Sequence, residues 1–154
     1  MTETLLNRTV VLTFLGEPAP QGSKQMTRWG GMREVSKKIE PWRASVQYAC
    51  LEQYKGPIIT DPVSLVLTFR LPRPKNHWSS AKGKEDQLLP SAPMHHTTTP
   101  DIDKLIRGLL DPLTVRCGGN VLKDDSLVVQ LKVHKQYANR FEPTGATATI
   151  IVLH

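Results

Sequence analysis

The chain has 154 residues, which is the size of one ordinary domain and long enough to bury a core unaided. Hydrophobic residues make up 39% and charged residues 22%, a balance that excludes a disordered chain. No apolar run is long enough to span a bilayer, and the net charge of +6 favours a polyanionic partner, since basic side chains that neutralise phosphates release counterions.

The first half of the chain predicts two strands separated by a loop and a helix. Residues 9–15 are apolar and β-rich and predict the first strand. The proline- and glycine-containing stretch 16–40 predicts a loop with room for a short hairpin, and Pro41 suits the first turn of a helix. Residues 63–71 predict the second strand. Between these strands, apolar residues recur at the spacing of one helix face, at Trp42, Val46, Ala49 and Cys50. Trp42 is expected in the core.

The second half begins with a long stretch, residues 72–100, that shows no periodicity. So long a loop is unusual in a compact domain unless it is functional. Thr99 suits the N-cap of a second helix and Pro100 its first position. The helix presents one apolar stripe: Ile102, Leu105, Ile106, Leu109, Leu110 and Leu113.

Two further strands complete the pattern. Residues 127–133 alternate and predict a half-buried strand, and residues 146–153 predict the last one. The order β, α, β, α, β, β indicates a single α/β or α+β domain. The residues expected on the buried face of the alternating strand are Leu127, Val129, Leu131 and Val133.

Basic residues crowd two loop-like stretches, 24–38 and 70–84, and each carries a tryptophan. Basic side chains bind phosphate and aromatic rings stack on exposed bases. Tryptophan in a basic loop is more often partly packed on the domain, which is the alternative for Trp29 and Trp78. Lys135 near the end of the alternating strand is either a DNA contact or a solvated cation. The candidate DNA-binding residues are Lys24, Arg28, Arg33, Lys37, Arg73, Lys75, Lys82, Lys84 and Lys135.

Five aspartates define a candidate metal site: Asp101 and Asp103 at the start of the second helix, Asp111 two turns further, and Asp124 and Asp125 at the entrance of the alternating strand. A compact domain can bring that entrance beside the helix start. Crowded carboxylates repel each other unless a hard cation such as Mg²⁺ binds them. Such a metal makes a bound water more acidic and polarises a phosphoryl oxygen, which is the chemistry of phosphodiester hydrolysis.

Spacing alone leaves a plainer interpretation open. Asp103 and Arg107 have the spacing of an ordinary helical ion pair, and residues 124–125 suit a turn before a strand. His95 and His96 are likewise either phosphate contacts or a solvated pair in the loop.

The second half also carries a longer pattern: a D-x-D at a helix start, an Asp-x-Leu about one helix later, a D-D pair that opens a strand, and a lysine near its end. This pattern resembles the RusA family of Holliday junction resolvases. With Pro20–Lys24 and Pro72–Lys75, the resemblance covers nearly the whole chain. The matching segments are PDIDKL at 100–105, DPLT at 111–114, KDDSLVV at 123–129, and Lys135 with Tyr137.

The resemblance implies a homodimer in which residues 1–154 form one α+β domain, a mixed sheet packed by two main helices. It implies an enzyme of DNA recombination and repair that makes paired symmetric nicks in four-way junctions with Mg²⁺, for which we expect Mn²⁺ to substitute. No small-molecule cofactor is expected. The family occurs in bacteria and bacteriophages, and residues 1–4 lack the features of a signal peptide, so we expect a cytoplasmic protein without membrane association.

The resemblance also assigns roles to residues. The family's catalytic aspartates fall on Asp101, Asp103 and Asp125, and these three with Asp124 are expected to bind the metal. The family's catalytic lysine falls on Arg107, which keeps the charge and clamps phosphate in two bonds but does not readily donate a proton. Lys104 stands where the family often has asparagine. Arg107 and Lys104 are therefore alternative basic catalytic residues.

Three other functions remain open from the sequence. The first is a DNA-binding protein without catalysis, which the carboxylates oppose because they would hinder phosphate binding without a metal. The second is a nuclease for flaps or replication forks. The third is a nucleotide phosphohydrolase, which the pI of about 9.5 opposes because a small substrate needs no extended basic surface.

Overall fold

The computed structural model describes residues 8–154 apart from residues 23, 27, 31 and 35–36, and it gives the backbone alone for residues 24–26 and 32–34. One mixed sheet has the strand order β1-β6-β4-β5. β4 and β5 run parallel, whereas β6 is antiparallel to both β1 and β4. The strands are β1 (Arg8–Leu15), β4 (Val63–Leu71), β5 (Val128–Tyr137) and β6 (Gly145–Val152). The expected α+β domain with a mixed sheet is confirmed.

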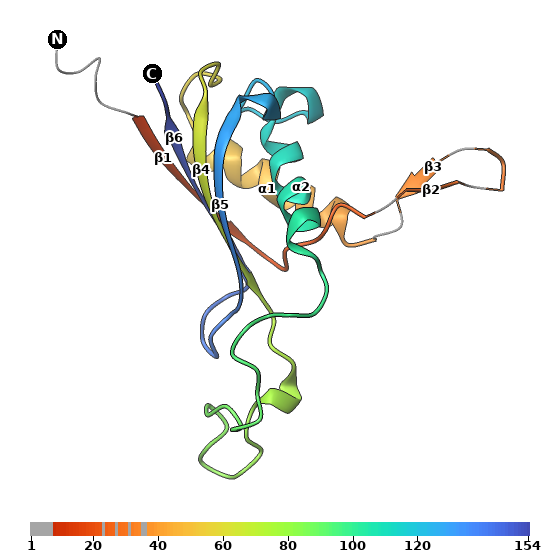
Figure 1. The fold of residues 1–154 in the computed structure, drawn as a ribbon, viewed down its shortest axis with the longest axis vertical. Helices are drawn as coiled ribbons and strands as arrows, with labels where there is room; N and C mark the ends of the chain where they lie inside the picture. Colours follow the sequence, from red (N-terminus) through yellow and green to blue (C-terminus); the bar gives the residue numbers. More distant parts are fainter. Residues whose placement is uncertain (1–7, 23, 27, 31, 35–36) are drawn as a thin grey trace.

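Two helices, α1 (Ile39–Gln53) and α2 (Ile102–Leu113), pack on the same face of this sheet (Figure 1). In α1 the buried Trp42 meets Phe14 of β1 edge to face, with ring centroids 6.5 Å apart, which confirms its place in the core. Pro41 lies in the first turn as predicted, although the helix begins two residues earlier. No helix in the described part of the chain is long and apolar enough to cross a bilayer.

The connection from β4 to β5 is the crossover that a parallel pair requires. It consists of a long loop over residues 72–101, which includes the 3₁₀ helix η2 (Lys75–His77), followed by α2. The loop extends beyond the end of the sheet (Figure 1). Its two arms are joined by backbone hydrogen bonds from Ser79 to Gln87 at 2.8 Å and from Leu89 to His77 at 2.9 Å.

A second projection is the hairpin of β2 (Lys24–Met26) and β3 (Met32–Glu34), which stands away from the sheet in Figure 1. It confirms the expected short hairpin in the first loop. Trp29 lies in its turn and is 91% exposed, so it does not pack on the described part of the domain.

The predicted buried face of β5 is wrong for two residues, since Val129 is 59% exposed and Leu131 is 43% exposed. Among the described strands, β5 is an edge strand that pairs only with β4. A register shift pairs Val63 with Val128 and Ser64 with Gln130, which leaves Val129 without a partner in the ladder. Because β5 has a neighbour strand on one side only and carries a bulge, Val129 and Leu131 are exposed where the alternation predicts burial.

The predicted start of the second helix is also wrong, because α2 begins at Ile102 with Asp101 as its N-cap. The first helical hydrogen bond runs from the Leu105 amide to the Asp101 carbonyl at 3.1 Å. Asp101 and Asp103 nevertheless lie at the helix start, as expected.

Candidate active site

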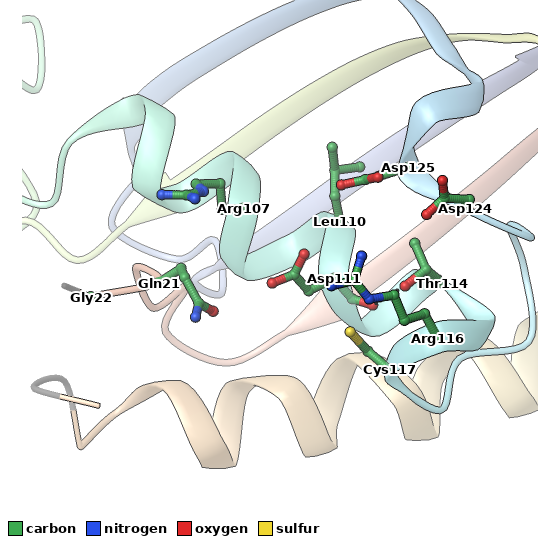
Figure 2. Close-up of a pocket in the computed structure, with 10 residues that line it drawn as sticks. All are labelled: Gln21, Gly22, Arg107, Leu110, Asp111, Thr114, Arg116, Cys117, Asp124 and Asp125. Carbon is green, nitrogen blue, oxygen red and sulfur yellow. Dashed lines mark hydrogen bonds between the residues drawn. The ribbon is translucent and has the colours of Figure 1, made fainter. Parts of the chain in front are cut away.

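A polar pocket of about 490 Å³ opens along one side of α2. The 3₁₀ helices η3 (Val115–Cys117) and η4 (Asp125–Leu127) contribute to its wall. Figure 2 shows the acidic and basic side chains that line it. Its lining residues are Gln21, Gly22, Arg107, Leu110, Asp111, Thr114, Arg116, Cys117, Asp124 and Asp125.

Gly108 explains how the segment before the hairpin comes so close to α2. A Cβ atom at this position would lie 2.4 Å from the Ala19 carbonyl oxygen and 3.3 Å from the Gln21 amide nitrogen. Glycine therefore allows the segment to cross the helix, where the Gln21 amide donates to the Lys104 carbonyl at 3.0 Å. The crossing places Gln21 in the pocket wall.

The acidic pair lies at the entrance of β5, as the sequence predicts. Ser126 Oγ donates to Asp124 Oδ2 at 2.6 Å. This hydrogen bond lowers the pKa of Asp124 below its ordinary value, and backbone N–H groups and the charge of Arg116 lower it further. Asp124 and Asp125 both line the pocket and supply carboxylate oxygens to it.

The entrance of β5 lies beside the end of α2 rather than beside its start. Leu122 forms an isolated bridge with Thr114, and the Val115 amide donates to the Leu122 carbonyl at 3.0 Å. This follows from the crossover, because a helix between parallel strands runs back along them and ends where the next strand begins. Asp111 and Arg107, rather than Asp101 and Asp103, are therefore the charged helix residues that line the same pocket as the acidic pair.

Asp101 and Asp103 are exposed and do not line the pocket. Lys104 Nζ lies 3.8 Å from Asp101 Oδ2, an ion pair within the first turn. Their role as metal ligands with Asp125 remains a prediction.

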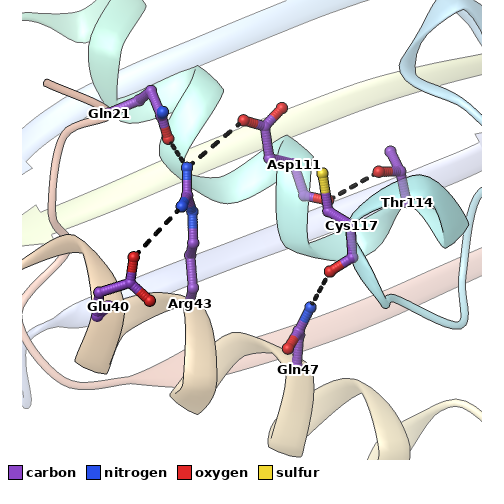
Figure 3. A network of polar contacts seen from close by, with 7 residues as sticks. All are labelled: Gln21, Glu40, Arg43, Gln47, Asp111, Thr114 and Cys117. Carbon is purple, nitrogen blue, oxygen red and sulfur yellow. Dashed lines mark hydrogen bonds and ion pairs between the residues drawn. The ribbon is translucent and has the colours of Figure 1, made fainter. Parts of the chain in front are cut away.

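A polar network behind the pocket connects α1 to α2 (Figure 3). Arg43 reaches from α1 to Asp111, with Nη2 3.8 Å from Oδ2, and it also hydrogen bonds to the Gln21 side chain. Its Nη1 lies 3.7 Å from Glu40 Oε1. Sequence reasoning missed Arg43, because nothing in the pattern of α1 distinguishes it from an ordinary basic residue on the helix flank.

The turn after α2 completes the wall. Thr114 Oγ1 donates to the Asp111 carbonyl at 2.8 Å, and Gln47 of α1 donates to the Cys117 carbonyl at 2.7 Å. Gly118 in this turn has a φ of +91°, a left-handed backbone conformation that favours glycine. Arg116 was not predicted, although its position between two acidic segments was a usable signal.

The predicted DNA-binding residues lie in different settings. Those with exposed side chains are Arg28, Lys37, Lys75, Lys82 and Lys84. The side chains of Lys24 and Arg33 lie outside the described part of the structure. Trp78 is half-buried, with the Arg140 guanidinium 5.1 Å above its ring.

Arg73 and Lys135 make specific contacts at the base of the long loop. The Arg73 guanidinium lies 4.1 Å from the centre of the Tyr137 ring and donates to the Pro93 carbonyl at 2.7 Å. Lys135 Nζ donates to the carbonyls of Thr98 and Pro100. His96 is buried against Tyr137, so the interpretation of a solvated histidine pair is wrong for His96.

The chemistry of the pocket fits a hard divalent cation. Within the described ranges, no three His, Cys, Asp or Glu side chains are already arranged to hold a metal ion. Mg²⁺ commonly binds through only one or two carboxylates and completes its shell with waters and substrate phosphate. The adjacent Asp124 and Asp125 provide such oxygens, with Arg107 and Arg116 near by for phosphate.

Comparison with known proteins identifies the family of the chain. The chain matches the family described as Endodeoxyribonuclease RusA over residues 16–144, which include every residue that lines the pocket. It is also 33% identical over 132 residues to "Uncharacterized protein YqaN" of Bacillus subtilis (strain 168), a match that covers 84% of this chain and 88% of the relative. The chain therefore belongs to the RusA family of endodeoxyribonucleases, enzymes that resolve Holliday junctions.

Proposed function

We propose that this enzyme uses Mg²⁺ to make paired symmetric nicks in four-way DNA junctions, with Mn²⁺ as a substitute, in recombination and repair. The observation that carries the proposal is one pocket lined by both Asp124 and Asp125 and by Arg107 and Arg116. Carboxylates bind the metal and guanidinium groups bind phosphate, so the two together suit a phosphodiester.

The proposed roles follow from side-chain chemistry. Asp125 and Asp124 hold a metal ion in the pocket. Asp101 and Asp103, at the other end of α2, are further metal ligands by family resemblance. When bound, Mg²⁺ supplies a more acidic water and polarises a phosphoryl oxygen. Arg107 donates two parallel hydrogen bonds to phosphate oxygens and offsets the charge that develops on them. Lys104 is the alternative basic group.

The first experiment compares Asp125→Asn, Asp103→Asn and Asp111→Asn, with the exposed Asp61→Asn as control. An end-labelled four-way junction is incubated with Mg²⁺ or EDTA, and binding is measured separately in EDTA. We expect Asp125→Asn and Asp103→Asn to lower cleavage at least on the order of 100-fold while binding is kept or strengthened, because a repulsive charge is removed. Asp61→Asn should cleave normally.

The outcomes separate two ligand sets. If Asp103→Asn cleaves at the rate of the wild type, the D-x-D segment is not part of the metal site. Loss of cleavage in Asp111→Asn and Asp125→Asn alone would assign the metal to the pocket carboxylates. If flap DNA and junction DNA are cleaved equally, the activity is general cleavage of branched DNA rather than junction resolution. If the protein binds DNA but does not cleave it under any metal condition, the proposal that it cleaves DNA is contradicted.

We further propose that the working form is a homodimer. A four-way junction has approximate two-fold symmetry, and a two-fold dimer places one site on each of two opposing strands. Light scattering should give twice the chain mass of 17.2 kDa at working concentrations. A mass of one chain, together with paired nicks, would contradict the dimer.

A further inference from the structure

Lys135 lies near the end of β5, on the face of the sheet that the helices cover. Its neighbour in β4 is the buried Phe69, and the Lys135 side chain is itself half-buried. The ammonium donates to the Thr98 carbonyl at 2.9 Å and to the Pro100 carbonyl at 3.0 Å. One side chain of the sheet thus holds two carbonyls that are 37 and 35 positions away in the sequence.

These two carbonyls immediately precede the D-x-D segment. Helical hydrogen bonding starts with the Asp101 carbonyl, so the Pro100 carbonyl lies outside the helix and needs another donor. An ammonium supplies charge-assisted hydrogen bonds, which are stronger than those between neutral groups. Lys135 therefore determines where the chain enters α2.

The adjacent contacts on β5 support the same function. Tyr137 lies two residues further on the same face, and its ring centre is 4.6 Å from that of His96. Lys135 and Tyr137 together fasten the segment from residue 96 to residue 100 along the strand. The segment cannot shift relative to the sheet without losing both sets of contacts.

We propose that Lys135 is a positioning residue, which fixes Asp101 and Asp103 relative to β5, the strand whose entrance carries Asp125. This inference rests on the proposed function, in which these aspartates bind the metal. A direct contact with DNA phosphate is the less favoured role, because the carbonyls already occupy two of the three N–H donors of the ammonium.

The first test uses metal-free protein and does not depend on activity. Hydrogen exchange is measured by mass spectrometry for Lys135→Met and for Lys132→Met, a matched loss of charge at an exposed position on the opposite face of the same strand. We expect the amides of residues 105–107, the first that donate helical hydrogen bonds, to exchange on the order of ten-fold faster in Lys135→Met only, because two charge-assisted bonds are lost. Equal protection in both variants would overturn the proposal.

The second test asks whether the position of the aspartates matters for the metal. Mn²⁺ binding is measured by calorimetry, and junction binding is measured in EDTA. Lys135→Met should bind Mn²⁺ several-fold more weakly and cleave more slowly, while its affinity for the junction stays equal to that of Lys132→Met. Lys135→Arg keeps a charged donor and should restore both properties. A selective loss of junction binding in Lys135→Met would make Lys135 a DNA contact instead.

The failures of the two proposals are distinguishable. If Asp103→Asn is inactive but Lys135→Met cleaves and binds Mn²⁺ normally, the positioning role fails and the metal site stands. If Asp103→Asn is fully active, the metal site fails, and the exchange experiment still decides whether Lys135 holds the helix start. If Lys135→Met does not fold, the same comparison is made with Lys135→Gln, which keeps a neutral donor and is expected to show a smaller change.

Discussion

The guanidinium of Arg43 on α1 lies 3.8 Å from the carboxylate of Asp111 on α2, and both side chains are about one third exposed or less. This ion pair connects the two helices at the wall of the pocket (Figure 3). The Arg43 cation of α1 thus contacts the Asp111 carboxylate, which lines the pocket, so a substitution in α1 can alter the pocket.

Arg43→Met should therefore lower the free energy of unfolding by about 1 kcal/mol, the upper range for a partly exposed pair. Urea denaturation measures the change. The control is Glu40→Gln, which removes a pair whose acidic side chain is 76% exposed and should cost under about 0.5 kcal/mol. Equal effects of the two substitutions would show that the contact with Asp111 adds nothing.

Gly108→Ala tests the close crossing over α2. Alanine is intrinsically better than glycine in a helix by about 1 kcal/mol, but its Cβ would lie 2.4 Å from the Ala19 carbonyl oxygen. We expect a net loss of about 2 kcal/mol by urea denaturation, since overpacked backbone must move. Ser45→Ala at an exposed position of α1 should change stability by under about 0.5 kcal/mol. A more stable Gly108→Ala would refute the crossing as described.

His96 predicts a pH dependence of stability. Burial lowers the pKa of His96 below the ordinary 6.5, and the charge of Lys135 lowers this pKa further. Below pH 6.5 the unfolded chain binds a proton that the folded chain does not, so stability falls as pH falls until the lowered pKa is reached.

His96→Phe keeps an aromatic ring against Tyr137 and should remove this loss. On acidification below pH 6.5, the unfolding free energy of the wild type should therefore fall relative to that of His96→Phe. The exposed neighbour His95, changed to Gln, serves as control. A constant difference between pH 7.5 and 5 would contradict the burial of a neutral imidazole.

Lys82→Ala tests whether the tip of the long loop contacts phosphate. One lost phosphate contact should reduce the slope of log K against log salt by about 0.9 for duplex arms. The measurement is junction binding at several salt concentrations in EDTA. Lys55→Ala is the control, because Lys55 Nζ hydrogen bonds to the Leu51 carbonyl at the far end of α1. Equal slopes for the two variants would place Lys82 outside the DNA surface.

Much of the fold was predictable because its signals are local. The strand over Val63–Leu71 has the bounds that its β-branched and apolar run predicts, and the last strand differs by one residue at each end. The stripe of α2 is buried apart from Ile102, which is 40% exposed at the helix start, and Ile106, which is partly buried. Periodicity carries this information directly.

The start of α2 was not predictable for a physical reason. Thr99 and Pro100 have the residue types of a helix start, but Lys135 binds the carbonyls of Thr98 and Pro100 from another strand. A contact between residues so far apart in the sequence leaves no trace in local spacing. The exposed Val129 has a similar origin, because its register depends on pairing with β4.

The candidate site was predictable in its residue types and less so in its arrangement. The acidic pair at residues 124–125 and Arg107 line one pocket, as their chemistry suggests. The spacing does not say which end of α2 faces that pair, since this depends on the direction of the crossover. Gln21 comes from a segment whose approach depends on the absence of a side chain at Gly108, and Arg43 reaches the site from α1.

The closed base of the long loop has a consequence for how this enzyme can evolve. Backbone hydrogen bonds join its arms at residues 77–79 and 87–89, and Lys135 and Tyr137 fasten the returning arm to β5. Residues 80–86 can therefore change in length or charge without moving Asp101, and doubling such a segment costs only about 0.6 kcal/mol of closure entropy. The tip of this loop can thus diverge among relatives while the start of α2 keeps its place against the sheet.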